Sequence, residues 1–385
     1  MKLYYFDNSA TSNPKPESVY LEVISSLRNL NSNPGRGGHQ LAVKTAEAIY
    51  KVRKKIKEFF NFENELNLAF VNNSTTALNY AVKGVMEKGA LILTSNIEHN
   101  STLRPIYMAK DEFNGEIEIL EGENLEKKIE MRLLNNSLKK PKILILNHMS
   151  NVTGKTLEIR KIGKICRKIG VIFILDVSQS AGILPIDMLE MNIDILCFTG
   201  HKSLFGIQGI GGICLREGIT LKATVVGGTG SHTREVYQPL EMPEHLEAGT
   251  LNVPGIISLG AGIDFINFVG IKNIHLKENL LKKKFIEGIK RIDKERKVTL
   301  YTSYGENDGP VVSMNIEGIT SSDLSSYLDE EFNIITRSGL HCAPLIHKEL
   351  KTEFIGATRF SFGYFNTEEE IDYTIEAIET ILKQI

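Results

Sequence analysis

The chain of 385 residues is 42% hydrophobic and 24% charged, which is typical of a globular protein large enough for two domains. Lys and Arg (45) nearly balance Asp and Glu (47), and this net charge of −2 argues against the basic excess of a nucleic-acid binder. No apolar run is long enough for a signal peptide or a membrane span. We therefore expect a cytoplasmic protein with neither a nucleic-acid nor a membrane partner.

Hydrophobic periodicity predicts alternating helices and strands in the first two thirds of the chain. In chain order these are a helix at 41–60, a strand at 68–71, a helix from about Ala77, strands at 91–94 and 142–146, a helix at 158–168, a strand at 171–175, a helical turn at 188–191 and a strand at 193–198. Strand–helix–strand units with short connections predict a parallel sheet with right-handed crossovers.

The last third of the chain follows a different pattern. It predicts one long helix at 263–291, strands at 297–301, 311–316 and 333–336, and helices at 321–331 and 367–383. This α+β pattern places a boundary near residue 264, with a large domain at 16–264 and a small domain formed by 1–15 and 265–385. The lysine-rich face at 277–284 is expected to be a solvated surface.

Four cysteines, Cys166, Cys197, Cys214 and Cys342, form neither a C-x-x-C pair nor a zinc-finger spacing. This pattern predicts no disulfide framework, no metal site and a reducing compartment. The first three lie in apolar segments and should behave as small hydrophobic side chains. Cys342 differs because it lies between His341 and an Ala-Pro pair in a glycine-containing loop.

Two charged residues follow neighbouring predicted strands. Asp176 ends the strand at 171–175, and Lys202 comes just after the strand at 193–198. The carboxyl ends of parallel strands meet at one edge, so both side chains should face the same crevice. A lysine there suits a Schiff base, and an aspartate suits a pyridinium nitrogen. The alternative for each residue alone is an ordinary surface position.

Small hydroxyl residues and a histidine follow two earlier strands. Ser74 and Thr75 precede a helix, where they could bind phosphate or simply cap the helix. His99 follows the strand at 91–94 and could stack on a ring, move protons or be structural.

The Cys342 loop and a nearby arginine complete the candidates. Cys342 follows Arg337, a glycine and His341 in this loop, and such neighbours make it a candidate reactive thiolate. The alternative is a buried structural cysteine. Arg359, flanked by apolar residues, could bind a carboxylate in bidentate fashion or close a buried ion pair. The glycine run at 206–212 lacks the G-x-G-x-x-G spacing and no P-loop occurs, so no nucleotide site is expected.

Taken together, these motifs resemble the class V aminotransferase family, specifically its cysteine desulfurases and selenocysteine lyases, which use pyridoxal 5'-phosphate (PLP). The matching segments are 5–11, 176–179, 199–202, 247–250, 337–343 and 363–367. The resemblance implies an α/β fold-type I transferase (aspartate aminotransferase-like), with a mostly parallel sheet in the large domain and a small α+β domain.

The resemblance implies a role for each matching residue. Lys202 would bind PLP covalently and, with Cys342 and His99, act in catalysis. The implied cofactor contacts are Asp176 at the pyridine nitrogen, Gln179 and Asn151 at the phenolic oxygen, His99 on the ring, and Ser74, Thr75, Thr199, His201 and the other subunit's Thr250 at the phosphate. Arg359 would bind the substrate carboxylate, and Asn8, Ala10 and His39 would line the substrate side.

The resemblance also implies a reaction and partners. L-Cysteine would be converted to L-alanine with the sulfur captured as a persulfide on Cys342, in a homodimer with shared active sites. The short Arg337–Cys342 spacing resembles group II desulfurases, although Leu340 and Asn100 stand where those enzymes usually have histidine. An acceptor protein would then receive the sulfur or selenium.

Several other functions stay open at this point. Within the family they are an L-selenocysteine lyase, a transaminase and a kynureninase-like lyase. Outside it they are a sulfur carrier without activity, disfavoured because Lys202 and Asp176 are both present, and an oxidoreductase, disfavoured by the missing fingerprint.

Overall fold

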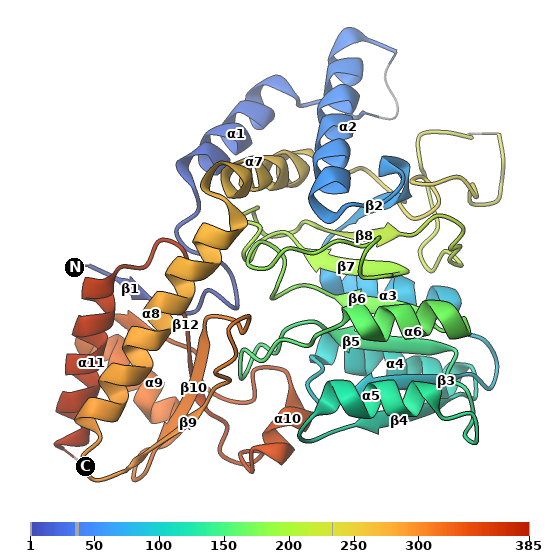
Figure 1. Cartoon of the computed structure of the whole chain (residues 1–385). Coiled ribbons are helices and arrows are strands. Elements are labelled where there is room, and N and C mark those ends of the chain that lie inside the picture. The colour runs from blue at the N-terminus through green and yellow to red at the C-terminus, as the bar shows by residue number, and fades with distance from the viewer. Residues whose placement is uncertain (1, 35–37, 233, 385) are drawn as a thin grey trace.

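The computed structural model describes residues 2–34, 38–232 and 234–384 and contains a larger part built on one long sheet and a smaller part beside it (Figure 1). The larger sheet has seven strands in the order β2-β8-β7-β6-β5-β3-β4. Their bounds are β2 (Leu68–Val71), β3 (Leu91–Ser95), β4 (Glu116–Leu120), β5 (Ile143–Asn147), β6 (Ile172–Asp176), β7 (Ile195–Thr199) and β8 (Gly211–Leu215).

The pairing confirms the predicted parallel sheet. Strands β4, β3, β5, β6 and β7 pair in parallel, whereas β8 runs antiparallel to both β7 and β2. Because β2 therefore points the same way as β7, six strands bring their carboxyl ends to one edge. The α/β fold class is confirmed.

Helices cover both faces of this sheet. The bounds are α1 (Glu17–Asn29), α2 (Gln40–Phe60), α3 (Ser74–Val85), α4 (Asn100–Glu112), α5 (Leu125–Leu134), α6 (Arg160–Ile169) and α7 (Val253–Val269), with a 3-10 turn at Glu65–Asn67. Alternate side chains of each strand enter opposite cores: Ile143 belongs to the core that includes residues of α3 and α4, whereas Leu144 belongs to the core that includes residues of α2, α5, α6 and α7. The period of two thus places hydrophobic residues in both layers.

The smaller part is an antiparallel sheet covered by helices. It contains α8 (Ile271–Ile292), β9 (Val298–Tyr301), β10 (Val311–Ile316), α9 (Ser321–Phe332), α10 (Pro344–Glu349), β12 (Thr358–Ser361) and α11 (Glu368–Leu382). The sheet order is β12-β10-β9, and β1 (Tyr4–Tyr5) pairs in parallel with β11 (Ile334–Ile335). The N-terminal strand is thus joined to the C-terminal part, as Figure 1 shows.

Two predicted elements differ from the structure. The single helix predicted at 263–291 is wrong, because α7 and α8 meet at Gly270 (φ +87°) with a bend of 82°. The helix expected from about Ala77 already starts at Ser74. The helical turn expected at 188–191 is confirmed, since the Met191 N–H donates to the Asp187 carbonyl at 2.9 Å. α7 packs against α1 and α2, whereas α8 packs against α11.

The packing partner changes at Gly270, after the end of α7, and not at residue 264, which lies within that helix. The division near residue 264 therefore stays a proposal, and its outermost positions, 1 and 385, lie outside the described residues. Within the described residues, no single helix is long and apolar enough to cross a membrane; only the bent pair α7 and α8 passes that test together.

Candidate active site

A cavity of about 250 Å³ lies at the carboxyl edge of the large sheet. Its walls are contributed by residues that follow β2, β3, β5, β6 and β7, and they are Asn73, Ser74, Thr75, His99, Ser101, Asn147, Asn151, Asp176, Ser178, Gln179, Thr199, His201 and Lys202. The structure therefore brings together nine residues that the sequence motifs singled out: Ser74, Thr75, His99, Asn151, Asp176, Gln179, Thr199, His201 and Lys202.

Asp176 is fixed by short local bonds. Its Oδ1 accepts hydrogen bonds from the Ser178 backbone N–H at 2.9 Å and from the Ser74 hydroxyl at 3.2 Å. The residue is only 2% exposed. A carboxylate held in this way has a fixed orientation, which suits an ion pair with a group in a fixed position.

Lys202 lies in the wall of the same cavity. Desolvation lowers the pKa of Lys202 to about 8, even though the nearby Asp176 raises it. A lysine with this pKa is a neutral amine far more often at pH 7 than an exposed lysine is. More of the Lys202 amine is therefore available as a nucleophile or general base at neutral pH.

Three buried polar atoms in the cavity wall have no hydrogen-bond partner among the described residues. They are Asn151 Oδ1, Thr199 Oγ1 and His201 Nδ1. Buried polar groups are nearly always hydrogen-bonded, so the wall is built for a polar ligand.

The N-terminus of α3 adds further donors to this wall. Asn73 already caps the helix, its side chain accepting from the Thr76 N–H at 3.0 Å. Ser74 and Thr75, in the first turn, are not needed as caps, which favours the phosphate-binding interpretation of the two. Gly211 makes this geometry possible, since a Cβ there would lie 2.9 Å from the Asn73 backbone.

His99 is held in one tautomer. Its Nδ1 accepts from the Ser101 N–H at 3.0 Å and caps α4, so the proton of the neutral ring lies on Nε2. Desolvation, together with the charges of Lys202 and Arg337, lowers the pKa of His99 to about 4. The ring is therefore uncharged at neutral pH.

Asn151 and Gln179 line the cavity with their amide nitrogens already engaged. The Asn151 Nδ2 donates to the His341 carbonyl at 2.7 Å, and the Gln179 Nε2 donates to the Ser9 carbonyl at 3.1 Å. The buried Asn151 Oδ1 has no partner. These bonds connect the wall to the cysteine loop and to the N-terminal segment.

Arg359 forms the buried ion pair that was one of its two sequence interpretations. It is 1% exposed, and its Nη2 binds Asp7 Oδ1 at 2.6 Å while Nη1 donates to the Asn151 carbonyl at 3.1 Å. The Arg359 Nε remains without a partner. The sequence reasoning missed Asp7, although it lies in the N-terminal motif beside Asn8.

The cysteine loop lies against the start of α4. The Cys342 carbonyl accepts from the Asn100 N–H at 2.7 Å, and an Arg337 nitrogen lies 3.6 Å from the Cys342 sulfur. His341 and Cys342 both have positive φ (49° and 57°), a conformation that turns the chain sharply. Burial lowers the pKa of His341 to about 2, so His341 is neutral at pH 7 and Arg337 is the charged group in contact with the sulfur.

The other three cysteines are buried, as predicted. Burial raises the pKa of the Cys166 thiol to about 12 and also raises those of Cys197 and Cys214. Cys342 alone is partly exposed. Within the described residues, no group of three His, Cys, Asp or Glu side chains could hold a metal ion.

Six predicted site residues do not line the cavity of this chain: Arg359 and Cys342, described above, and four others. Thr250 and His39 are exposed, and the His39 side chain caps α2 by accepting from the Ala42 N–H at 3.2 Å. Asn8 lines a small neighbouring cavity that shares Gln179 with the main one, and Ala10 is half-buried in the same N-terminal turn.

Besides Asp7, five residues at the site were given no role from the sequence. Asn73, Ser101, Asn147 and Ser178 line the cavity, and Glu98 lies buried directly before His99. Asn147 is the last residue of β5 and the other four follow the end of a strand by a few positions, and that position was the available signal.

The comparisons with known proteins agree with this geometry. Residues 4–374 match the family model described as aminotransferase class-V. The chain belongs to this family. A class-V relative named probable cysteine desulfurase, from Pyrococcus abyssi, is 31% identical and covers 100% of this chain and 95% of its own.

Solved structures of the family give the same result. An apo cysteine desulfurase from Thermococcus onnurineus has a TM-score of 0.91 and 30% identity over 100% of this chain and 95% of its own. The cysteine desulfurase CsdA from Escherichia coli, at 24% identity over 99% of this chain and 95% of its own, has a TM-score of 0.85 and supports the fold. The predicted family and fold are confirmed.

Proposed function

We propose that this class-V enzyme is a PLP-dependent cysteine desulfurase that converts L-cysteine to L-alanine and keeps the sulfur as a persulfide on Cys342. One observation carries the proposal. The loop of Cys342, the one partly exposed cysteine, lies next to the cavity that contains Lys202 and Asp176. A hydrogen bond from Asn151 in the cavity wall to the His341 carbonyl joins the two. The relatives named above support the same activity.

The residues of the cavity fit PLP. Thr199 and His201 each present a buried atom without a partner, and Ser74 and Thr75 lie at a helix N-terminus that favours a phosphate. Asp176 would pair with the pyridine nitrogen, His99 would stack on the ring, and Gln179 and Asn151 would flank the phenolic oxygen. Bound there through Lys202, PLP supplies an acceptor for the electrons of the substrate's Cα–H bond.

The protein's own groups would then divide the reaction between them. Arg359 binds the substrate carboxylate, with Asn8, Ala10 and His39 on the substrate side. The Lys202 amine takes the proton from the substrate Cα, as its pKa of about 8 allows. The Cys342 thiolate forms a bond to the substrate sulfur, the carbon–sulfur bond breaks, and the carbon takes the electron pair and a proton to give alanine.

A homodimer with shared sites is part of the proposal. Thr250, assigned to the partner's phosphate site, is exposed, and Gly249 next to it donates to the Gly228 carbonyl at 2.8 Å. The segment 234–240, which precedes Gly249 in the chain, carries strongly exposed apolar side chains, Val236 (92%), Tyr237 (85%) and Leu240 (82%). An exposed apolar patch of this kind supports burial against a second copy.

The fate of the sulfur completes the proposal. An acceptor protein receives it from Cys342, whose loop carries the partly exposed Leu340. A cytoplasmic, reducing compartment would keep this thiol free before each turnover.

The test of the proposal uses two variants of the purified enzyme. Lys202→Ala should lose the visible absorbance of bound PLP, and borohydride reduction of the wild type should attach PLP to Lys202, as located by peptide mass spectrometry. Attachment elsewhere would refute the assignment.

Cys342→Ala should abolish alanine formation from L-cysteine and spare it from L-selenocysteine, because selenium leaves more readily. An equal loss of alanine formation from both amino acids would contradict the proposal that Cys342 is needed only to capture sulfur. A keto acid instead of alanine would indicate a transaminase.

A further inference from the structure

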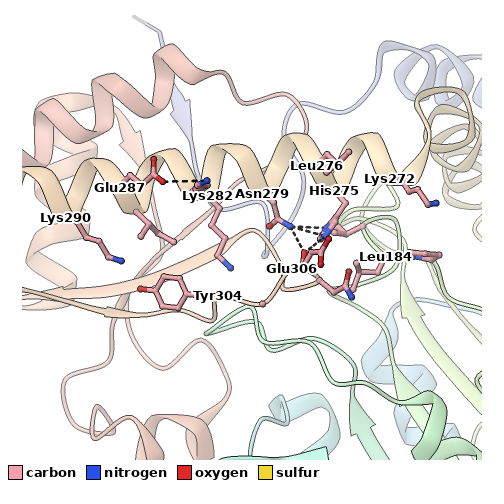
Figure 2. A pocket seen from close by; sticks show the side chains of 16 residues that line it. Leu184, Lys272, His275, Leu276, Asn279, Lys282, Glu287, Lys290, Tyr304 and Glu306 are labelled. Carbon is pink, nitrogen blue, oxygen red and sulfur yellow. Dashed lines mark hydrogen bonds and ion pairs between the residues drawn. The ribbon is translucent and has the colours of Figure 1, made fainter.

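A second, larger cavity lies beside α8, where the smaller part of the molecule faces the larger part. It has a volume of about 730 Å³, shares no residue with the catalytic cavity, and lies between α8, the segment Tyr304–Asn307 and the loop Ile183–Pro185 (Figure 2). We call it the α8 groove. Nothing in the proposed reaction uses it.

The α8 groove is elongated along the helix. The α8 residues in its wall are Lys272, His275, Leu276, Asn279, Lys282, Lys283, Ile286, Glu287 and Lys290. Their spacing of three and four marks one continuous face of the helix. At 1.5 Å per residue, the distance from Lys272 to Lys290 is about 27 Å, which suits a polypeptide segment better than a small metabolite.

The α8 groove has an exposed apolar floor. Leu276 is 66% exposed and Tyr304 is 64% exposed, and Leu184 and Ile286 lie beside them. Figure 2 shows Leu276 and Leu184 at one end and Tyr304 beneath the other end. Apolar side chains left accessible in one recess are typical of a binding surface.

Positive charge predominates along the same face. Four lysines line the groove against two glutamates, which leaves an excess of two positive charges. Of these lysines, Lys272 and Lys290 lie at the two ends and have no carboxylate within 4.0 Å among the described residues, whereas Lys283 pairs with Glu287 at 3.9 Å. Burial lowers the pKa of His275, which therefore adds no charge at neutral pH.

The buried Lys282 makes the middle of the α8 groove rigid. Its ammonium donates to the carbonyls of Ser303 at 2.7 Å and Gly309 at 2.9 Å and thereby joins α8 to the chain on both sides of the Tyr304–Asn307 segment. The groove is thus preformed, which lowers the entropic cost of binding.

We propose that the α8 groove binds an acidic, amphipathic segment of a partner protein, with apolar side chains on Leu276 and Tyr304 and carboxylates at Lys272 and Lys290. This arrangement follows the mode in which an amphipathic helix occupies a hydrophobic groove. Because Ile183–Pro185 belongs to the larger part and α8 to the smaller part, the bound segment contacts both.

The test uses a fluorescent synthetic helix as the probe. The peptide is about 18 residues long, to match about 27 Å of helix, with leucine on one face and glutamate on the other. Fluorescence anisotropy at physiological ionic strength compares its binding to the PLP-loaded wild type, to Leu276→Asp and to the double variant Lys272→Glu/Lys290→Glu. We expect saturable binding that each variant weakens at least tenfold.

Matched controls separate the α8 groove from the rest of this surface. Leu280→Asp changes a 55% exposed leucine of the same helix outside the groove, and Lys294→Glu changes an exposed lysine just beyond it. Both should bind like the wild type, and a peptide with lysine in place of glutamate should bind only the double variant. Unsaturable binding, equal binding by all variants, or equal binding of the basic peptide to the wild type would overturn the proposal.

Discussion

Replacing Glu98 by glutamine should remove a pH dependence from the stability of the protein. Glu98 is completely buried behind the cavity wall. Its Oε1 accepts from the Ser95 hydroxyl at 2.6 Å and from the Asn147 N–H at 2.9 Å, whereas Oε2 has no hydrogen-bond partner in the part of the chain that the structure describes. Desolvation raises the pKa of Glu98 to about 8, and the nearby Asp176 adds to the shift.

The sign of the effect follows from proton binding in the two states. Between the ordinary value of 4.5 and about 8, folded Glu98 keeps a proton that the unfolded chain loses. The stabilising effect of the proton is therefore complete below pH 4.5 and is lost as the pH rises toward 8. Each pH unit in this window costs about 1.4 kcal/mol, or about 3 kcal/mol between pH 5 and 7.

The glutamine variant keeps the accepting oxygen and cannot titrate. The assay is the free energy of unfolding in urea at pH 5 and pH 7 for the wild type, for Glu98→Gln and for Glu63→Gln, an exposed control. From pH 5 to pH 7, the free energy of unfolding of Glu98→Gln should rise by about 3 kcal/mol relative to that of the wild type. The free energy of unfolding of Glu63→Gln should change with pH as that of the wild type does. A difference between wild type and Glu98→Gln that stays constant with pH would refute this reasoning.

Three further changes test the site and its support. Arg359→Lys should raise the KM for L-cysteine at least tenfold and leave the PLP absorbance intact, because a lysine lacks the bidentate guanidinium; an unchanged KM would contradict the carboxylate role. Glu247 and Arg53 form a buried ion pair. Glu247→Gln should lower the free energy of unfolding, measured in urea, by about 3 kcal/mol, because Arg53 would be left as an unpaired buried charge. A loss below about 1 kcal/mol would show that this pair contributes no more than a surface pair does. Gly211→Ala should weaken PLP affinity in a fluorescence titration, because its Cβ would lie 2.6 Å from the Phe198 carbonyl; unchanged affinity would show that this contact relaxes freely.

The order of strands and helices could be read from the sequence because it depends on local periodicity. Parallel strands at 171–175 and 193–198 place the residues that follow them at one edge, and this rule was enough to join Asp176 with Lys202. The separate nature of Cys342 was also visible, since its neighbours are polar and the other cysteines lie in apolar runs.

Only the tertiary structure decided which charges meet across the chain. Asp7 and Arg359 are 352 positions apart, and the Cys342 carbonyl binds the Asn100 N–H of a different part of the molecule. No local pattern specifies such pairs, because they depend on how the two parts pack. The same packing bends α7 from α8 at Gly270 and leaves Leu276 exposed in a groove where the sequence indicated only a charged helix face.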